Sequence, residues 1–273
     1  MRVLVINDLS CVGKCSLSVA LPIISACGVT CDVLPTAILS THTGGFEGYT
    51  FRDLTDDLPE ILKHWKTLGI KFDFIYSGYL GSIRQIELVS ILKQEFLAED
   101  GKFIVDPVMG DDGKLYQGFT EGYVEKMRGL CKEADYILPN VTEACLLAEH
   151  PYPVTKENAR EVLNKLAEIC PFPIVTGITV ENDVAVYYTK RGRGIFSFTH
   201  ENVQGFFCGA GDVFASAFVG CLANGIHEAK AIYLASEFTA KTIRRSAREV
   251  DDKRYGLSFE KEILGFLDSL LFS

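Results

Sequence analysis

Short apolar segments rich in β-branched residues alternate with amphipathic segments of helical periodicity along most of the chain. The first four pairs are RVLVI (2–6) with 16–27, CDVLPTAI (31–38) with 54–68, FDFIYSG (72–78) with 83–96, and KFIVDPV (102–108) with 120–131. Apolar runs of this length predict buried strands, and helices between successive strands predict right-handed crossovers. The alternation therefore predicts an α/β fold with a mostly parallel sheet covered by helices on both faces.

The later segments continue the strand series and suggest how the sheet ends. Further strands are expected at ADYILPN (134–140), PFPIVTG (171–177), DVAVYYTK (183–190) and GIFSFTH (194–200), and three helical segments from Gly211 onward. The last two strands are joined by KRGRG, which predicts an antiparallel hairpin at one edge of the sheet. Because no repeat or Pro/Gly/Ser-rich linker divides the sequence, residues 1–273 are expected to form one domain.

Charge and cysteine usage exclude several classes of function. A net charge of −9 disfavours a nucleic-acid or anionic membrane surface as the main partner. The N-terminal apolar run is too short for a signal peptide, and no segment is long enough to span a membrane. The nine cysteines are spread along the chain without CxxC pairs or a histidine cluster, so we expect reduced thiols in a cytoplasmic protein rather than a zinc site.

Polar residues follow the ends of the predicted strands. They are Asp8, the Ser77-Gly78-Tyr79 segment, Asp106, Asn140 and Thr176. Parallel sheets bind ligands at the carboxyl ends of their strands, so these side chains are expected to meet on one edge. A lone histidine, His42, is more often structural than catalytic.

The stretch CGAGDVF (208–214) places a carboxylate among small residues at the start of a predicted helix. Small residues leave backbone N–H groups bare at a helix N-terminus, where an anion binds favourably. Asp212 beside such an anion site suggests phosphoryl transfer, although it could instead cap the first helical turn. A Walker A loop is not expected, because GKCS (13–16) lacks the upstream glycine and has a cysteine where the hydroxyl belongs. A GxGxxG motif is also missing after the first strand.

Three oxygen-bearing residues suggest a magnesium site. Asp106 leaves a buried strand, where an unpaired carboxylate is costly unless it meets a cation or donors. Asn140 and Glu143 follow in PNVTE (139–143) and would supply further hard oxygen ligands. The alternative is structural, with Asn140 or Thr142 capping a helix whose first turn contains Glu143.

These segments together resemble the signature segments of the pyridoxal kinases in the ribokinase-like superfamily. The resemblance rests on STHTG (40–44), SGYLGS (77–82), DPVMGD (106–111), PNVTE (139–143) and CGAGDVFAS (208–216), which occur in the family's order and span most of the chain. It implies a ribokinase-like three-layer α/β/α sandwich and ATP-dependent phosphorylation of the 5′-hydroxymethyl group of pyridoxal, pyridoxamine or pyridoxine. It also implies a homodimer and a need for Mg²⁺, and it leaves open whether a monovalent cation is required.

The resemblance implies a role for each motif residue. It makes Asp212 the general base and assigns the donors to the transferring phosphoryl group to Gly209, Ala210 and Gly211. Residues along ATP would be Asp111, Asn140, Thr176, Gly209 and Gly211, and those holding the metal would be Asp106 and Glu143. Contacts to the B6 vitamer would come from Asp8, Thr43, Tyr79 and Asp212.

The sequence departs from the family pattern around its first strand. Many pyridoxal kinases have IQSH where this chain has IND, so Asp8 would face the ring nitrogen or the phenolic oxygen. Lys14 and Cys15 also alter the turn that follows. These departures leave the preferred vitamer open. The alternatives are a hydroxymethylpyrimidine kinase of thiamin synthesis and a B6-binding protein without catalysis.

Overall fold

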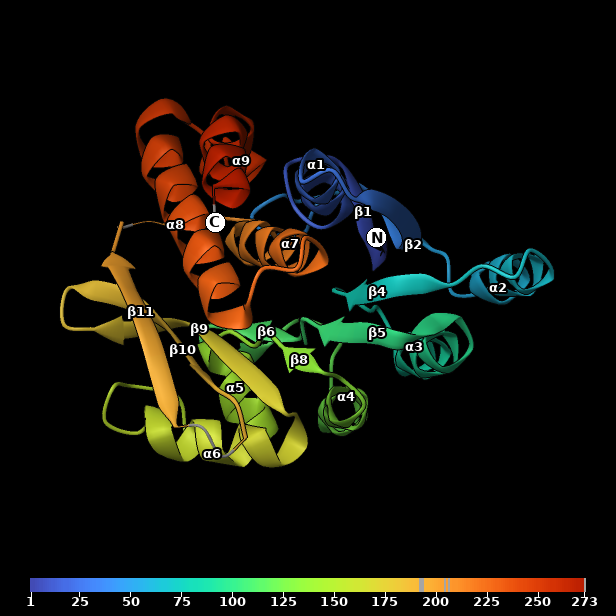
Figure 1. The fold of residues 1–273 in the computed structure, drawn as a ribbon, viewed down its shortest axis with the longest axis horizontal. Coiled ribbons are helices and arrows are strands. Elements are labelled where there is room, and N and C mark those ends of the chain that lie inside the picture. Colours follow the sequence, from blue (N-terminus) through green and yellow to red (C-terminus); the bar gives the residue numbers. More distant parts are fainter. Residues whose placement is uncertain (192–193, 204, 206, 273) are drawn as a thin grey trace.

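A single nine-stranded sheet with helices on both faces organises the computed structural model, which describes residues 1–191, 194–203, 205 and 207–272 (Figure 1). Its strands run in the order β11-β10-β9-β8-β5-β4-β1-β2-β3. Their bounds are β1 Arg2–Val12, β2 Thr30–Thr41, β3 Phe51–Asp53, β4 Phe72–Ser77, β5 Leu97–Val105, β8 Tyr136–Ile137, β9 Phe172–Val180, β10 Asp183–Thr189 and β11 Ile195–Glu201.

The sheet is parallel through its centre and antiparallel at its edges. Strands β2, β1, β4, β5, β8 and β9 pair in parallel. The β10–β11 hairpin and the short strand β3 add antiparallel pairs at the two edges. This confirms the predicted α/β sandwich and its edge hairpin, although residues 192–193 of the KRGRG turn lie outside the described residues.

Two groups of helices cover the two faces. One face carries α1 (Leu17–Ala26), α7 (Ala210–Ala223), α8 (Glu228–Glu249) and α9 (Ile263–Leu271), and the other α2 (Leu58–Thr67), α3 (Ile83–Phe96), α4 (Glu121–Lys132), α5 (Val141–Ala148) and α6 (Ala159–Ile169) (Figure 1). Strand β1 shows why both faces are apolar: Val3 and Val5 pack in the first layer, and Leu4 and Ile6 in the second. Side chains alternate across a strand, so a continuous apolar run serves two cores.

Some elements were not among the expected segments. Helices α5 and α6 follow β8 and lead to β9, and a small separate hairpin of β6 (Gly110–Asp111) and β7 (Lys114–Leu115) follows β5. The expected three closing helices are confirmed as α7, α8 and α9, with short 3₁₀ turns at Lys253–Tyr255 and Phe259–Lys261 between the last two. Within the described part of the chain, no helix is long and apolar enough to cross a bilayer.

Candidate active site

The motif residues after four central strands lie on one edge because the backbone ladder continues beyond the strands. Gly78 N donates to Ile6 O at 2.8 Å, and Asp106 N donates to Ser77 O at 2.8 Å. Leu138 N donates to Val105 O at 3.0 Å. These bonds bring the chain segments that carry Asp8, Tyr79, Asp106 and Asn140 side by side, as the strand-end rule predicted.

Helix α7 begins beside this edge with a glycine in the left-handed region. Gly209 is the N-cap, with φ of 80°, and a Cβ on it would overlap the carbonyl oxygen of Lys14. Gly211 is different, because a Cβ there would meet nothing within 4 Å. Among the described residues, no side chain caps the helix. The first amides of α7 are therefore free to bind an anion, and the alternative in which Asp212 caps the helix is wrong.

Asp212 lies in the first turn of α7 and has an unusual acidity. The pKa of its carboxyl group is raised to about 7, mainly by burial and also by the charge of Asp8, against the lowering effects of the Ser16 backbone amide and the Asn7 side chain. The residue as a whole keeps some exposed surface. A carboxylate with a pKa near neutrality can accept a proton at physiological pH and release it afterwards.

Asp106 is a second buried carboxylate of the cluster. It is 8% exposed, and among the described residues no donor is directed at its carboxylate. Burial raises its pKa well above the usual range, and the charges of Glu143 and Asp212 raise it further. A cation beside Asp106 would offset all three effects, so this side chain fits a metal ligand.

Glu143 and Asn140 are occupied by the protein itself. Glu143 accepts from Asn140 N at 2.9 Å and from Met109 N at 3.1 Å, and Asn140 Oδ1 accepts from Glu143 N at 2.9 Å. This is a capping box at the start of α5, as the structural alternative predicted. Within the described ranges, no three His, Cys, Asp or Glu side chains group as metal ligands.

The opposite side of the site contains Asp8 and Tyr79. Asp8 is 6% exposed and accepts hydrogen bonds from Ser16 Oγ at 2.6 Å and Ser10 Oγ at 3.2 Å. Burial raises its pKa, and the two hydroxyl groups oppose that rise. The pKa of Tyr79 is raised to about 12, first by burial and then by the charge of Asp8. Its ring stacks at 6.0 Å on Phe119. Asp8 and Tyr79 thus form one wall of the site, which contains a carboxylate and an aromatic ring.

The segment from Asp252 to Gly256, which we call the C-terminal strap, holds the loops around this wall. The Arg254 carbonyl accepts from His42 Nε2 at 2.6 Å, and Tyr255 O accepts from Lys14 N at 3.1 Å. The Arg254 guanidinium lies 5.2 Å from the centre of the Phe46 ring. His42 is thus structural, as expected. Sequence reasoning missed the strap, because nothing in its local pattern indicates what it contacts.

The remaining predicted residues are not brought to Asp212 by any contact. Asp111 is exposed on β6, and its Oδ1 accepts from Asp112 N at 2.9 Å. Thr43 is exposed. Thr176 forms an isolated parallel β-bridge with Asn140 through the backbone. Their roles toward ATP and the vitamer remain predictions.

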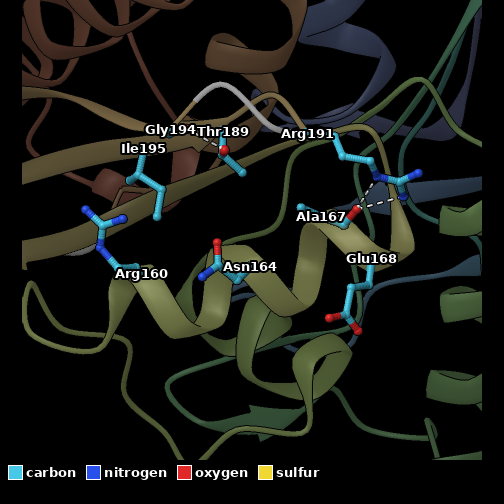
Figure 2. A pocket seen from close by; sticks show the side chains of 8 residues that line it. All are labelled: Arg160, Asn164, Ala167, Glu168, Thr189, Arg191, Gly194 and Ile195. Carbon is cyan, nitrogen blue, oxygen red and sulfur yellow. Dashed lines mark hydrogen bonds between the residues drawn. The ribbon is translucent and has the colours of Figure 1, made fainter.

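A cavity of about 510 Å³ lies away from these residues, between helix α6 and strands β10 and β11 (Figure 2). None of the predicted site residues lines it. Figure 2 shows Arg191 turned toward the end of α6, where its Nε and Nη2 donate to Ala167 O at 3.0 and 2.8 Å. The arginine therefore stabilises the last turn of α6.

Several known proteins are similar to this chain in both sequence and fold. The family described as phosphomethylpyrimidine kinase matches residues 21–256. A Bacteroides thetaiotaomicron protein assigned as a phosphomethylpyrimidine kinase, solved in a form with pyridoxal, is 36% identical over 98% of this chain and 95% of its own, with a TM-score of 0.91. The pyridoxal kinase of Lactobacillus plantarum is 32% identical over 98% and 96% of the two chains, with a TM-score of 0.91.

A curated relative extends the similarity to plants. The pyridoxal kinase of Arabidopsis thaliana is 25% identical over 71% of this chain and 65% of its own length. The chain thus spans just under two thirds of that relative. The matched region includes every strand-edge motif from His42 to Asp212. The chain therefore belongs to the phosphomethylpyrimidine kinase family, in the ribokinase-like superfamily that includes the pyridoxal kinases.

Proposed function

We propose that this protein transfers the γ-phosphoryl group of ATP to the 5′-hydroxymethyl group of pyridoxal or a related B6 vitamer. The observation that carries the proposal is Asp212, a carboxylate with a pKa near 7 at the uncapped N-terminus of α7. The relatives whose names include pyridoxal kinase support the choice of substrate. Phosphoryl transfer requires a base, an anion site and charge neutralisation, and this edge of the sheet contains residues for each.

The residues of the chain divide the reaction between them. Asp212 takes the proton of the hydroxymethyl group as its oxygen forms a bond to the γ-phosphorus. The bond from that phosphorus to the bridging oxygen of ATP breaks, and ADP leaves with the electron pair. Backbone N–H groups of Ala210 and Gly211, beside Gly209, hold the negative charge of the transferring group. The helix dipole adds to this stabilisation.

Magnesium fits the cluster at Asp106. Asp106 would hold the ion, while Glu143 and Asn140 would anchor its water ligands from the start of α5. When bound, Mg²⁺ neutralises charge on the phosphates of ATP. An Asp106→Asn variant should therefore need more Mg²⁺ for half-maximal turnover, and an unchanged requirement would contradict this assignment. Asp111 and Thr176 would lie along the ATP phosphates.

Asp8, Thr43 and Tyr79 would bind the vitamer ring. The Asp8 carboxylate could accept a hydrogen bond from a protonated ring nitrogen, and Tyr79 would cover one face of the ring. The hydroxyl groups of Ser10 and Ser16 hold Asp8 in place and leave its charge available. Selection among the vitamers would thus depend on this carboxylate.

The test is a turnover assay with Mg-ATP and a panel of pyridoxal, pyridoxamine, pyridoxine and hydroxymethylpyrimidine. Product formation with a B6 vitamer is expected, and repeating the assay in Na⁺ or K⁺ buffers tests the need for a monovalent cation. Preference for hydroxymethylpyrimidine would overturn the substrate assignment. Binding of pyridoxal without any turnover would overturn the catalytic one.

We also propose that the protein is a cytoplasmic homodimer with one folding unit. All nine cysteines are unpaired, as in a reducing compartment. Ile38, Tyr49 and Phe51 are 38%, 38% and 45% exposed beside the edge strand β3, where a second copy could cover them. Light scattering should give twice the monomer mass, and a Phe51→Asp variant should shift the protein toward the monomer.

A further inference from the structure

Asn7 is a polar side chain buried at the carboxyl end of β1, next to the predicted base. It is 1% exposed, and an amide at that depth is costly unless its hydrogen bonds are satisfied. Its contacts therefore reveal what the residue is for. They join three segments that are far apart in the sequence.

The oxygen of the Asn7 amide is fixed by two backbone donors. Asn7 Oδ1 accepts from Tyr79 N at 2.8 Å and from Asp8 N at 3.0 Å. An amide nitrogen cannot accept these bonds, so the orientation of the side chain is determined. The Nδ2 group must then point the other way. It lies 3.4 Å from Asp212 Oδ1, across 205 residues of sequence.

The neighbouring backbone leaves room for this amide. Gly78 follows β4, and a Cβ there would overlap Asn7 Nδ2 and lie 2.6 Å from Asn7 Cγ. The φ of Gly78 is not in the left-handed region, so conformation does not require glycine at this position. The space that Gly78 leaves is occupied by Asn7. This is a second observation, independent of the hydrogen bonds, that the amide has a set position.

An amide suits this position better than a charged group. The site already contains Asp8, Asp106 and Asp212, each of which has a pKa raised by burial. Asn7 donates a hydrogen bond to Asp212 without adding charge. At 3.4 Å the bond is long, and catalytic hydrogen bonds in ligand-free proteins often shorten only when substrate binds.

We propose that Asn7 is a positioning residue, which orients the Asp212 carboxylate relative to the substrate by tying it to the ends of β1 and β4. This inference rests on the proposed kinase function. The same amide also accepts hydrogen bonds from the backbone of Asp8 and Tyr79. It therefore fixes the position of the base relative to the two residues proposed to bind the vitamer ring. Misplacement of a reacting group by about 1 Å can cost on the order of 10²-fold in rate, so the effect should be measurable.

The main test is a double-mutant cycle between positions 7 and 212. Asn7→Asp keeps the side-chain size and the acceptor for the two backbone amides, but it directs a carboxylate oxygen at Asp212. We expect kcat for the preferred vitamer to fall at least ~10-fold while KM for Mg-ATP stays within about twofold. In an Asp212→Asn background the same change should lower kcat by less than about twofold, because the residue it positions is already lost.

Two further variants separate this role from a purely structural one. Gly78→Ala displaces the amide from its other side and should reproduce the loss of kcat, also only when Asp212 is present. Asn158→Asp makes the same chemical change at the start of α6, where Asn158 Oδ1 accepts from Thr155 N, and should leave both constants unchanged. Thermal unfolding of each variant reports whether it is folded.

The outcomes distinguish the two proposals. A parent protein that phosphorylates no member of the vitamer panel overturns the proposed function and this inference with it. An active parent with a fully active Asn7→Asp variant overturns the positioning role alone. Equal losses in the parent background and in the Asp212→Asn background also overturn it, because the amide would then act independently of the base.

Discussion

At the scale of single residues, the proposed function depends on carboxylates whose pKa values are raised in the folded protein. Asp8, Asp106 and Asp212 are all buried, and burial is the largest cause of the raised pKa in each. Their surroundings differ, however. Asp8 accepts hydrogen bonds from two serine hydroxyl groups, and Asp212 accepts one from the side-chain amide of Asn7. Among the described residues, no donor is directed at Asp106. Three aspartates can thus perform three tasks within one site.

The first prediction concerns Asp212. Asp212→Asn removes the proton acceptor and keeps the side-chain size, so kcat should fall by about 10²- to 10⁴-fold with little change in ATP affinity. The parent kcat/KM should also decrease as the pH falls below about 7, because the base becomes protonated. The measurement is a pH–rate profile of both proteins. An Asn variant as fast as the parent would leave α7 as a phosphate-binding helix without a base.

The second prediction concerns the effect of Asp8 on which vitamer the protein prefers. Asp8→Ser removes a carboxylate from the ring site, so the ratios of kcat/KM among pyridoxal, pyridoxamine and pyridoxine should change. Ser10→Ala is a matched control, since it removes one hydrogen bond to Asp8 and keeps the charge. It should change the ratios less. Identical ratios in parent and Asp8→Ser would show that Asp8 does not contact the ring.

At the scale of elements, helices α7 and α5 differ in whether a side chain caps their first backbone amides. Helix α5 has a capping box, and its first amides are partly satisfied by Asn140. Helix α7 has a glycine N-cap and no capping side chain. An uncapped N-terminus leaves orphan donors, which destabilise the helix until an anion binds. An anion bound at the start of α7 would therefore stabilise this helix, as the proposed phosphoryl transfer requires.

The third prediction compares the two glycines of that helix start. Gly211→Ala adds a methyl group in open space and favours helix, so the melting temperature should stay the same or rise while KM for ATP increases. Gly209→Ala instead requires a left-handed alanine and overlaps Lys14 O, so it should destabilise the fold. Thermal unfolding and steady-state kinetics check both. Equal stability losses in the two variants would contradict this comparison.

The fourth prediction concerns Glu143, which is part of the capping box of α5 and also of the proposed metal site. Glu143→Gln can accept only one of the two backbone N–H groups that the carboxylate now accepts, because its amide nitrogen is a donor. The variant should lose about 1–3 kcal/mol of unfolding free energy. Denaturant unfolding is the measurement, and unchanged stability would speak against the capping role.

At the scale of the whole molecule, the site makes the ligand-free fold sensitive to pH. An aspartate has a pKa near 4 in the unfolded chain, and Asp212 has a pKa of about 7 in the folded protein. Between these values the folded state binds more protons than the unfolded state. The contribution of Asp212 to the free energy of unfolding is therefore fully present below about pH 4. It is lost as the pH rises through 7.

The fifth prediction follows from this sign. Asp212→Asn should raise the melting temperature of the ligand-free protein at pH 8 by at least ~2 °C, because it removes a buried charge. The gap between variant and parent should shrink at pH 5, where the folded parent is mostly protonated. Calorimetry at the two pH values gives both gaps. A gap of the same size at pH 5 and pH 8 would show that Asp212 is not desolvated.

The sequence by itself predicted the central strands, their carboxyl ends and the residues placed there, but not the short strands β3, β6 and β7. These features depend on local patterns: alternation in β1 assigns Val3 and Leu4 to opposite layers, and the small residues before Asp212 mark a helix start. The motif resemblance added the family. All of this is recorded within a few residues of each position, so periodicity and spacing can recover it.

Only the tertiary structure decided how those residues are used. The local sequence left open whether Glu143 belongs to a helix cap, and its contacts with Asn140 and Met109 show that it does. The contact of Asn7 with Asp212 and that of His42 with Arg254 join segments 205 and 212 residues apart. No local pattern encodes such distances, because they depend on how the strands are ordered and how the helices pack on them.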